Sequence, residues 1–309
     1  MPEFKQNVNL SEFSNYKIGG PARFFFEATR ADEVGRAVLT AKERGLDLFV
    51  LGGGTNLLID DNGFKGLVLK PSITFVELSG TTVTAGAGVL VKDLLAFAAK
   101  KGLSGLEWAG GLPGTLGGAI RGNAGAFGGE IKDVIHSVES FDTKKLKKLT
   151  RHKSECFFGY RTSVFKEKNG EEIILSATFA LKKGDSKKIS EAIQKKIDYR
   201  LRRHPMEYPN VGSIFKNVDL KKVPKNLQKK FAHVIKIDPF PVVPTAYLIS
   251  EAGLKGISYG GAMISPKHPN FIVNVFGAST ADVKNLIALV KKEVHKKFKI
   301  ILEEEVQLI

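Results

Sequence analysis

The sequence predicts an α+β protein with a boundary near residue 200. Three observations predict it. Amphipathic helical stretches alternate with short apolar β segments in the first hundred residues. Three later segments alternate apolar and polar residues as antiparallel strands do, and the chain after Pro205 has helices and strands of its own. No internal repeat is apparent.

The first hundred residues hold two predicted helices. Residues 32–44 form the first, because Val34, Val38 and Ala41 share one face and Gly45 can end the helix. The second is amphipathic, covers residues 89–102 and ends at Gly102. The β segments expected between them are 46–52, 67–70 and 74–88, with turn residues separating them.

After residue 130 the pattern changes to strands and longer helices. The predicted antiparallel strands are 134–142, 146–150 and 172–184. Residues 189–205 form a helix stopped by Pro205, with one face made of Ile189, Ile193, Ile197 and Leu201. The last helix is predicted over residues 280–298, where Ser279 and Asp282 resemble a capping box.

Composition excludes several classes of protein. The 309 residues are 43% hydrophobic and 26% charged, which suits a globular chain of about two domains. No apolar run is long enough to span a membrane, no signal peptide is recognised, and the one cysteine, Cys156, fits a reducing compartment. We therefore expect a cytoplasmic protein without a membrane partner.

The charge is unevenly spread. The net charge is +15, and all of the excess lies after residue 130. Such a balance attracts polyanions or phosphate-bearing ligands, although lysine-rich solvated faces give the same composition. A nucleic-acid reader would carry a recognisable module, and none is found, so no nucleic-acid partner is expected.

Two glycine-rich loops stand out. GGGTN covers residues 52–56, and the block from Gly110 to Glu130 has nine glycines in twenty-one residues. Glycine lets backbone amides approach a ligand closely and form anion-binding nests, which suggests a large phosphate-bearing ligand; tight turns between sheets are the alternative. The Rossmann pattern fails because Leu57 stands where its third glycine belongs, and no Gly-Lys pair exists for a Walker motif.

Taken together and in order, the two loops resemble the flavin-binding domain of the vanillyl-alcohol-oxidase type. Within that superfamily the chain resembles the MurB family, the UDP-N-acetylenolpyruvoylglucosamine reductases. The likeness covers nearly the whole chain through NYKIGGPARFF, CFFGYRTSVFK, VGSIFKN, LISEAGLKG, GGAMISPKHPNFIVN and LEEEVQLI. It implies a two-part FAD-binding domain over residues 1–75 and 76–200, followed by an α+β substrate-binding domain over residues 201–309.

The resemblance implies non-covalent FAD as cofactor and NADPH as reductant. The first loop would grip the pyrophosphate, and the second would wrap the dinucleotide and flank the flavin ring. The residues so implied are Gly52, Gly53, Gly54, Thr55 and Asn56 in the first loop, and Pro113, Gly114, Thr115, Gly117, Gly118, Asn123, Ala124 and Gly125 in the second. No metal is implied, and Cys156 is expected to be a buried apolar residue.

The implied reaction reduces UDP-N-acetylglucosamine enolpyruvate to UDP-N-acetylmuramate, a step of peptidoglycan precursor synthesis and cell wall biogenesis. Ser213 matches the family's proton donor, and Arg161 matches the arginine that meets the substrate carboxylate. Glu305 matches the glutamate that stabilises the enol or relays the proton, two roles that sequence does not separate. Because the three are far apart in the chain, the site is expected at a domain junction.

The remaining expectations concern the substrate and its surroundings. The candidates for the UDP part are Lys216 and Asn217, with Lys267, His268, Asn270 and Asn274 as weaker ones. Val218 replaces a proline common in the family, and residues 218–245 read as a basic, partly ordered insertion that leaves the contacts after Asn217 open. The short stretch between Arg161 and Ser213 matches the family class without a tyrosine-bearing segment over the substrate, and a monomer is favoured.

One rival shares the fold. A flavin oxidase acting on a sugar or alcohol would use oxygen as acceptor and often a His or Cys that tethers the flavin. Neither glycine loop contains a histidine. Peroxide formation without the enolpyruvyl substrate would favour this rival.

Overall fold

The computed structural model describes residues 2–238 and 240–309. They fall into two compact units. Unit 1 holds residues 2–8, Ala22–Gly53 and Phe64–Arg200, and unit 2 holds Asn9–Pro21, Gly54–Gly63 and Leu201–Ile309. Two short N-terminal pieces therefore belong to the same unit as the C-terminal third of the chain. The division expected at residues 75 and 200 stays a prediction.

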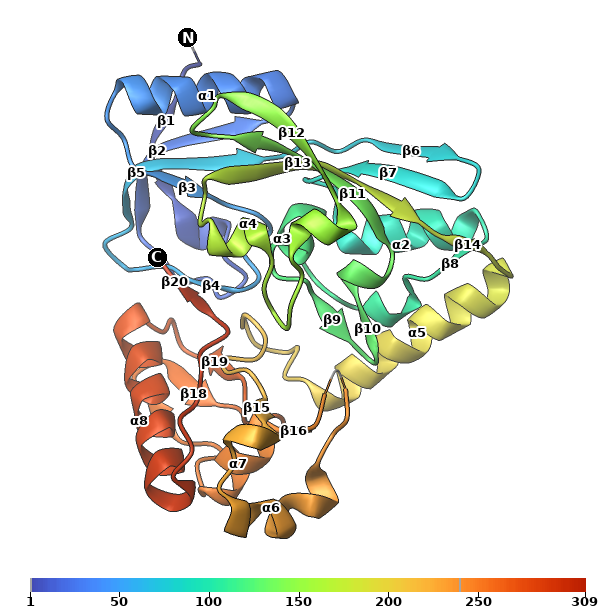
Figure 1. The fold of residues 1–309 in the computed structure, drawn as a ribbon. Coiled ribbons are helices and arrows are strands. Elements are labelled where there is room, and N and C mark those ends of the chain that lie inside the picture. The colour runs from blue at the N-terminus through green and yellow to red at the C-terminus, as the bar shows by residue number, and fades with distance from the viewer. Residues whose placement is uncertain (1, 239) are drawn as a thin grey trace. The chain divides into compact units, whose positions relative to one another are not determined.

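The first layer of unit 1 is a four-stranded sheet in the order β1-β2-β5-β3. Its strands are β1 (Lys5–Asn9), β2 (Pro21–Ala28), β5 (Phe64–Pro71) and β3 (Leu48–Val50), and β2 and β3 both run parallel to β5. Helix α1 (Ala31–Glu43) connects β2 to β3 and covers one face (Figure 1). Its buried side chains include Val34, Val38 and Ala41, which confirms the predicted apolar face.

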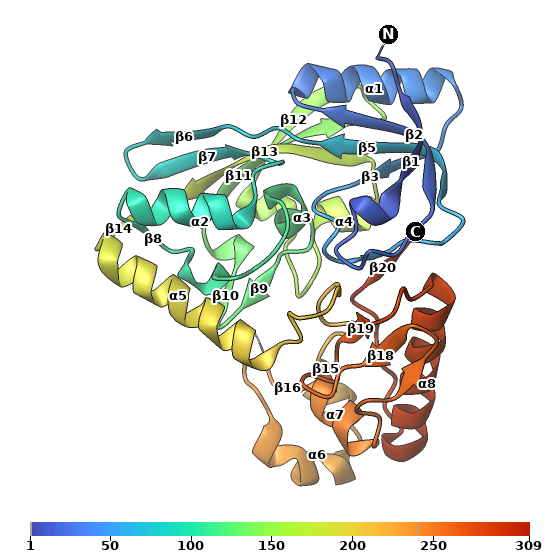
Figure 2. The same ribbon diagram turned by 180° about the vertical axis from the view of Figure 1, so that it is seen from behind.

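The second layer of unit 1 is a five-stranded sheet in the order β12-β11-β13-β7-β6. Its strands are β12 (Lys147–His152), β11 (Ile135–Asp142), β13 (Glu172–Ala180), β7 (Thr82–Gly86) and β6 (Val76–Ser79), and every pairing is antiparallel. The strands predicted over 134–142 and 146–150 are confirmed, whereas the one predicted over 172–184 divides into β13 and a short strand that pairs in another sheet. Helices α2 (Val91–Lys100) and α3 (Leu116–Arg121) lie on one side of this sheet, as Figure 2 shows.

Short elements complete unit 1. Strand β8 (Leu103–Ser104) pairs with β14 (Lys182–Lys183), and β9 (Gly125–Ala126) pairs with β10 (Gly129–Glu130). The 3-10 turns are η2 (Glu107–Ala109), η3 (Ile131–Asp133) and η4 (Lys153–Cys156), and α4 (Val164–Glu167) follows them. Helix α5 (Ser186–Arg203) ends just before Pro205, as predicted.

Of two side chains in this region that were predicted to be buried, one is exposed and one is buried. Leu201 of α5 is 55% exposed, so the apolar face expected along that helix does not continue to its end. The expectation for Cys156 is confirmed, because the thiol is fully buried and burial raises its pKa to about 11, far from a reactive thiolate.

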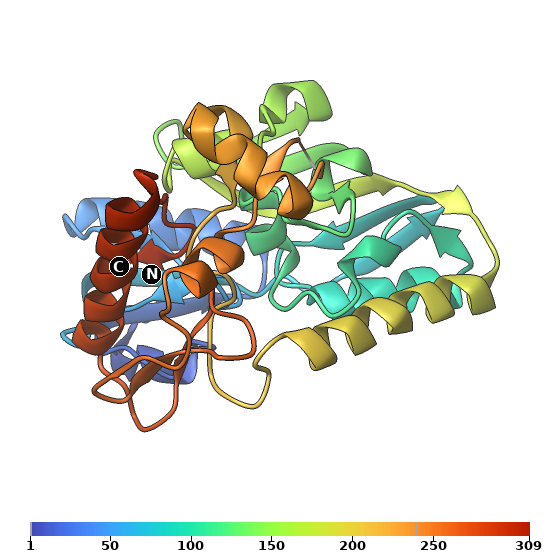
Figure 3. The same ribbon diagram turned by 90° about the horizontal axis from the view of Figure 1, so that it is seen from below.

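The core of unit 2 lies between helices and a small sheet. Antiparallel strands β17 (Ser258–Tyr259), β18 (Ala262–Ile264) and β19 (Ile272–Asn274) form the sheet, and helix α8 (Thr280–Phe298) packs on it (Figure 3). The predicted capping box of α8 is confirmed, since the Ser279 hydroxyl and the Asp282 carboxylate each accept a hydrogen bond from the other residue's N–H. Helix α7 (Thr245–Glu251) packs beside α8.

The N-terminal pieces complete this core. Tyr16 and Leu58 are fully buried among the side chains of residues 211–306. Strand β4 (Leu57–Leu58) runs parallel to β20 (Gln307–Leu308), and the turn η1 (Leu10–Glu12) precedes Tyr16. Unit 2 is thus built from three separate lengths of chain.

The segment 218–245 differs from its expectation. Its described residues are more regular than expected, since they form β15 (Val218–Asp219), η5 (Leu220–Lys222), α6 (Lys225–Phe231), η6 (Ala232–Val234) and β16 (Val242–Val243), with β15 and β16 paired. Whether the segment is an insertion stays a prediction. Phe231 is fully buried in the core of unit 2, and Val223, Val242 and Val243 are buried with it. Lysines stand between these apolar positions, so the segment looks basic in the sequence although it contributes apolar side chains to the core.

Candidate active site

A pocket opens in unit 1 beside both glycine loops. It encloses about 500 Å³, its solvent-open mouth included. Gly52 of the first loop and Thr115, Gly117 and Gly118 of the second line it, and Leu51, Ile173 and Ile174 give it an apolar wall. Main chain on one side suits phosphate, and an apolar wall on the other suits an aromatic ring.

The two loops touch at this pocket because glycines stand where they meet. A Cβ atom on Gly53 would lie 2.7 Å from the Cα of Gly114, and one on Gly52 would lie 3.1 Å from Oγ1 of Thr115. A Cβ on Gly117 would likewise lie 3.1 Å from that of Ala87. Gly118 differs, since apart from its neighbours and its own helix backbone the one described atom that its Cβ would meet within 4 Å is Thr115 Oγ1, at 3.6 Å. The loops therefore form a close backbone cradle, which fits the FAD that the sequence implies.

Other glycines of the long block serve the fold itself. A Cβ on Gly110 would meet the carbonyl oxygen of Ile193 in α5 at 2.5 Å. One on Gly129 would overlap the indole of Trp108. Part of the glycine content therefore lets α5 and Trp108 pack against the block. These glycines are needed for packing and not for a ligand.

Several implied cofactor residues are engaged within the protein. Asn123 has a left-handed backbone with φ of 42° and is fully buried. Its Nδ2 donates to Gly159 O over 2.9 Å and to the Glu130 carboxylate over 3.2 Å, and its Oδ1 accepts from Lys132 N–H. Asn123 therefore holds the conformation of the loop. Pro113, three residues before helix α3, is exposed instead.

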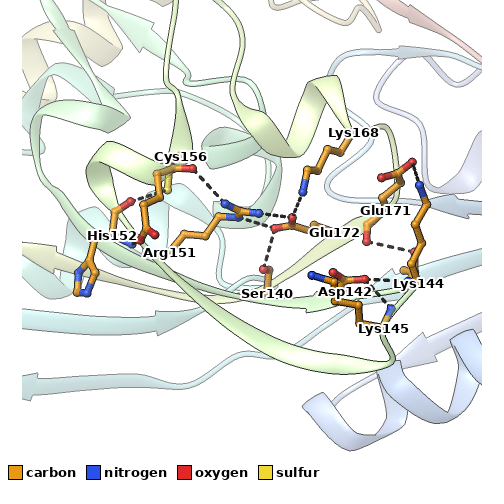
Figure 4. A network of polar contacts seen from close by, with 12 residues as sticks. Ser140, Asp142, Lys144, Lys145, Arg151, His152, Cys156, Lys168, Glu171 and Glu172 are labelled. Atoms are coloured by element: carbon orange, nitrogen blue, oxygen red, sulfur yellow. Dashed lines mark hydrogen bonds and ion pairs between the residues drawn. The ribbon is translucent and has the colours of Figure 1, made fainter.

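Glu172 and Arg121 line the same pocket, and sequence reasoning missed both. The Glu172 side chain is 1% exposed and accepts hydrogen bonds from Arg151, Lys168 and Ser140 (Figure 4). Burial works to raise the pKa of Glu172, but the hydrogen bonds from Arg151 and Lys168 outweigh burial and hold the pKa at about 2. Burial lowers the pKa of Arg121, which stays a cation at neutral pH. The charge pattern gave no signal for this network.

Arg161 lies beside the second glycine loop. Its backbone is left-handed, with φ of 58°, and its guanidinium donates to Gly125 O over 2.8 Å. A Cβ on Gly125 would come within 3.3 Å of that guanidinium, so the glycine leaves room for it. A left-handed arginine costs energy, and such backbone strain is common at functional sites.

Ser213 lies in an extended segment of unit 2 that is paired with the C-terminal residues. Phe215 bridges Glu304 in antiparallel fashion, and Lys216 N–H donates to Glu303 O over 2.9 Å. The carbonyl of Ile214 accepts from the N–H groups of both Glu305 and Val306, at 2.8 and 3.3 Å. Two successive N–H groups therefore share one carbonyl of the Ser213 segment. Ser213 and Glu305 thus lie on neighbouring, paired backbones.

The Ser213 hydroxyl is half-buried, and within residues 2–238 and 240–309 it makes no hydrogen bond. The residue before it, Gly212, has φ of 82° and donates its N–H to the Asn210 side chain. A hydroxyl without a protein partner can donate to a reacting group.

Glu305 is held from a second direction. The Asn56 side chain donates to the Glu305 carbonyl over 3.0 Å, and the Asn56 carbonyl accepts from Gln307 N–H. Asn56 was implied as a cofactor residue, and its side chain instead contacts the segment that carries Glu305. The cofactor role of Asn56 and Thr55 stays a prediction.

The implied UDP residues differ in their surroundings. Lys216 pairs with Glu303 at 3.4 Å, and Asn217 accepts a hydrogen bond from Thr245 N–H. Lys267 donates to Leu201 O over 3.0 Å. Asn270 is 3% exposed, with both ends of its amide on the main chain of Phe215, so its geometry does not support the expected UDP contact.

Comparison with known proteins decides the family. Residues 22–144 match the FAD binding domain, and residues 204–309 match the C-terminal domain of UDP-N-acetylenolpyruvoylglucosamine reductase. The reductase of Carboxydothermus hydrogenoformans is 42% identical over 97% of this chain and 93% of its own length. The chain belongs to the UDP-N-acetylenolpyruvoylglucosamine reductase family.

Further relatives agree. The reductase of Anoxybacillus flavithermus is 36% identical over 99% of this chain and 94% of its own. The crystal structure of MurB from Thermus caldophilus superimposes with a TM-score of 0.78 and 29% identity, covering 99% of this chain and 98% of that one. The predicted fold class, an FAD-binding domain followed by an α+β domain, is confirmed.

The reductase is an oxidoreductase with FAD as cofactor and NADPH as reductant. The close backbone cradle at Gly52, Gly53 and Gly117 fits this cofactor. Among the helices that the structure describes, none is long and apolar enough to cross a membrane.

Proposed function

We propose that this reductase reduces the enolpyruvyl double bond of UDP-N-acetylglucosamine enolpyruvate and that Ser213 protonates the resulting centre. The observation that carries the proposal is the Ser213 hydroxyl, which has no hydrogen bond in the described chain and lies on a backbone paired with that of Glu305. The product is UDP-N-acetylmuramate, a precursor of peptidoglycan.

FAD held at the backbone cradle of Gly52, Gly53 and Gly117 would supply hydride chemistry at the terminal carbon of the enolpyruvyl group, with NADPH as its reductant. Negative charge then develops at the carbon that bears the carboxylate. The Ser213 O–H donates its proton to that carbon, and the resulting alkoxide takes a proton from solvent water, so each turnover consumes one hydride and one solvent proton. A serine hydroxyl is a weak acid, and it serves here because the acceptor is strongly basic.

Arg161 binds the substrate carboxylate and the charge that develops beside it. The guanidinium fork matches a carboxylate in shape and charge, and the bond to Gly125 O fixes its direction. Glu305 stabilises the enol or relays the proton. The hydrogen bond from Glu305 N–H to Ile214 O supports either role, because it joins the backbone of Glu305 to the residue that follows Ser213.

The uridine diphosphate part contacts Lys216, Asn217 and Lys267 in this proposal. Lys216 and Asn217 follow Ser213 in the same segment, and all three side chains are polar and near the surface of unit 2. We also propose that the enzyme acts as a monomer in the cytoplasm. Light scattering and cell fractionation test these two points.

An anaerobic spectrum series tests the function. NADPH should bleach the flavin absorbance, and UDP-N-acetylglucosamine enolpyruvate should restore it. In Ser213→Ala the bleaching stage should be unchanged, whereas the recovery stage slows by at least ~100-fold. Ser190→Ala, on α5, is the matched control because its hydroxyl bonds only within the helix, to Ser186 O.

Two outcomes would contradict the proposal. Normal recovery in Ser213→Ala would remove the serine from the proton transfer. Bleaching followed by peroxide formation, with no response to the enolpyruvyl substrate, would favour an oxidase of the same fold.

A further inference from the structure

Asn270 holds the segment that carries Ser213. Its Oδ1 accepts a hydrogen bond from Phe215 N–H over 3.1 Å, and its Nδ2 donates to Phe215 O over 2.8 Å. Its own carbonyl accepts from Ile214 N–H over 2.8 Å. One residue therefore makes three hydrogen bonds to the two residues that follow Ser213.

The side chain of Asn270 acts as a substitute for a neighbouring strand. Residues 303–306 pair with one edge of the Ser213 segment, and Asn270 satisfies backbone groups that those residues do not. The amide is 3% exposed, so water cannot replace it without opening the core.

The other side of Ser213 has fewer restraints. Gly212 has φ of 82° and donates its N–H to the Asn210 side chain over 3.0 Å. Apart from its two neighbours, no atom of the described residues lies within 4 Å of the position that its Cβ would take, and glycine tolerates a wider range of backbone angles than other residues. The three hydrogen bonds from Asn270 therefore add restraint to Ser213 from the Ile214–Phe215 side.

We propose that Asn270 is a positioning residue, which fixes the Ser213 hydroxyl for proton donation without touching the substrate. The inference rests on the proposed role of Ser213. It assigns Asn270 to the proton-transfer step, in place of the UDP contact that the sequence implied.

The first test separates the two stages of turnover in Asn270→Ala. Bleaching by NADPH should stay within about twofold of the parent enzyme, and recovery with substrate should slow about 10- to 100-fold, because small displacements of a reacting group cost this much. Amide hydrogen exchange at Phe215 should rise in parallel. Tyr16→Phe is the control, since it removes a buried hydrogen bond to Ile272 O, two residues after Asn270.

The double variant of Ser213→Ala and Asn270→Ala tests whether the recovery defect of Asn270→Ala depends on Ser213, which a purely structural role does not require. If Asn270 acts through Ser213, Asn270→Ala should add little to the defect of Ser213→Ala. Asn270→Asp adds a rescue: a protonated carboxyl has one donor and one acceptor, as the amide has, so recovery should improve as pH falls.

The outcomes are distinguishable. A recovery defect in Ser213→Ala, but none in Asn270→Ala beyond that of Tyr16→Phe, overturns the positioning role and leaves the proposed function standing. If the two recovery defects multiply in the double variant, the positioning role of Asn270 is overturned as well. Normal turnover in Ser213→Ala instead overturns the proposed function itself.

Discussion

The side-chain amide of Asn56 donates a hydrogen bond to the main-chain carbonyl of Glu305, across 249 positions of sequence and 3.0 Å of space. The first glycine loop is thus joined to the segment of Glu305. Because the Asn56 carbonyl also accepts from Gln307 N–H, both ends of Asn56 restrain the C-terminal strand.

Replacing Asn56 by alanine should affect the substrate stage of turnover more than cofactor binding. We expect recovery with substrate to slow about 10-fold, because Glu305 loses the hydrogen bond that holds its carbonyl. The FAD dissociation constant, measured by fluorescence, should stay within about twofold. Asn62→Ala is the control, since that exposed side chain bonds only to Asp60 nearby. A large loss of FAD affinity would instead favour the cofactor role implied by the sequence.

Alanine at Gly118 should report on the cofactor alone. Its added methyl group would lie at an ordinary contact distance, 3.6 Å, from Thr115 Oγ1, so the melting temperature of the FAD-free protein should not fall. FAD affinity should drop at least ~10-fold if the cofactor approaches the backbone there. Gly129→Ala is the counterpart, because its methyl group overlaps Trp108 and should lower the melting temperature even without FAD. Unchanged affinity in Gly118→Ala would place FAD elsewhere.

Acid should destabilise the enzyme through Glu172. Its pKa in the folded chain is about 2, below the usual 4.5, so its contribution is complete above pH 4.5 and is lost as pH falls towards 2. The contribution is of order 3 kcal/mol, since one pKa unit corresponds to about 1.4 kcal/mol. Urea titrations between pH 2.5 and 6 measure it.

Glu172→Gln should flatten this pH dependence and also destabilise the protein at neutral pH by about 3–5 kcal/mol, because Arg151 and Lys168 keep their charge. Glu139→Gln, which breaks an exposed pair with Lys148, should change neither quantity by more than ~1 kcal/mol. The same pH slope in Glu172→Gln and in the parent chain would assign the acid sensitivity to another group.

Phe231→Ala should destabilise the protein by about 3–5 kcal/mol, since Phe231 is fully buried in the core of unit 2. Ile237→Ala, in the same segment but 80% exposed, should have almost no effect. Thermal or urea unfolding distinguishes the two. Equal, small effects would mean that residues 218–245 contribute nothing to the core.

Sequence patterns predicted the regular elements well because each pattern reflects one local cause. The stripe Val283, Leu286, Val290 predicts a helix packed on a core, and the structure buries all three. The same reasoning failed for Leu201, because a helical stripe shows which side chains share a face but not where the packing surface ends.

The polar roles were harder to predict, because they depend on partners distant in sequence. Nothing near Asn270 or Asn56 in the chain indicates that one holds Phe215 and the other holds Glu305. Glu172 has the same difficulty, since its partner Arg151 lies in β12, which β11 separates from the strand of Glu172. The glycines have the same difficulty. Gly53 and Gly129 look alike in sequence, but Gly53 packs against Gly114 of the second loop and Gly129 packs against the indole of Trp108.

The assembly of unit 2 from three lengths of chain affects how the protein can fold during synthesis. Tyr16 and Leu58 leave the ribosome early, but the side chains that bury them arrive with residues 211–306, and β4 gains its partner only with Gln307 and Leu308. These apolar residues therefore remain exposed during most of translation. Nascent chains with exposed apolar residues aggregate or bind chaperones. A fragment beginning at residue 204 would lack both side chains and would have an open core.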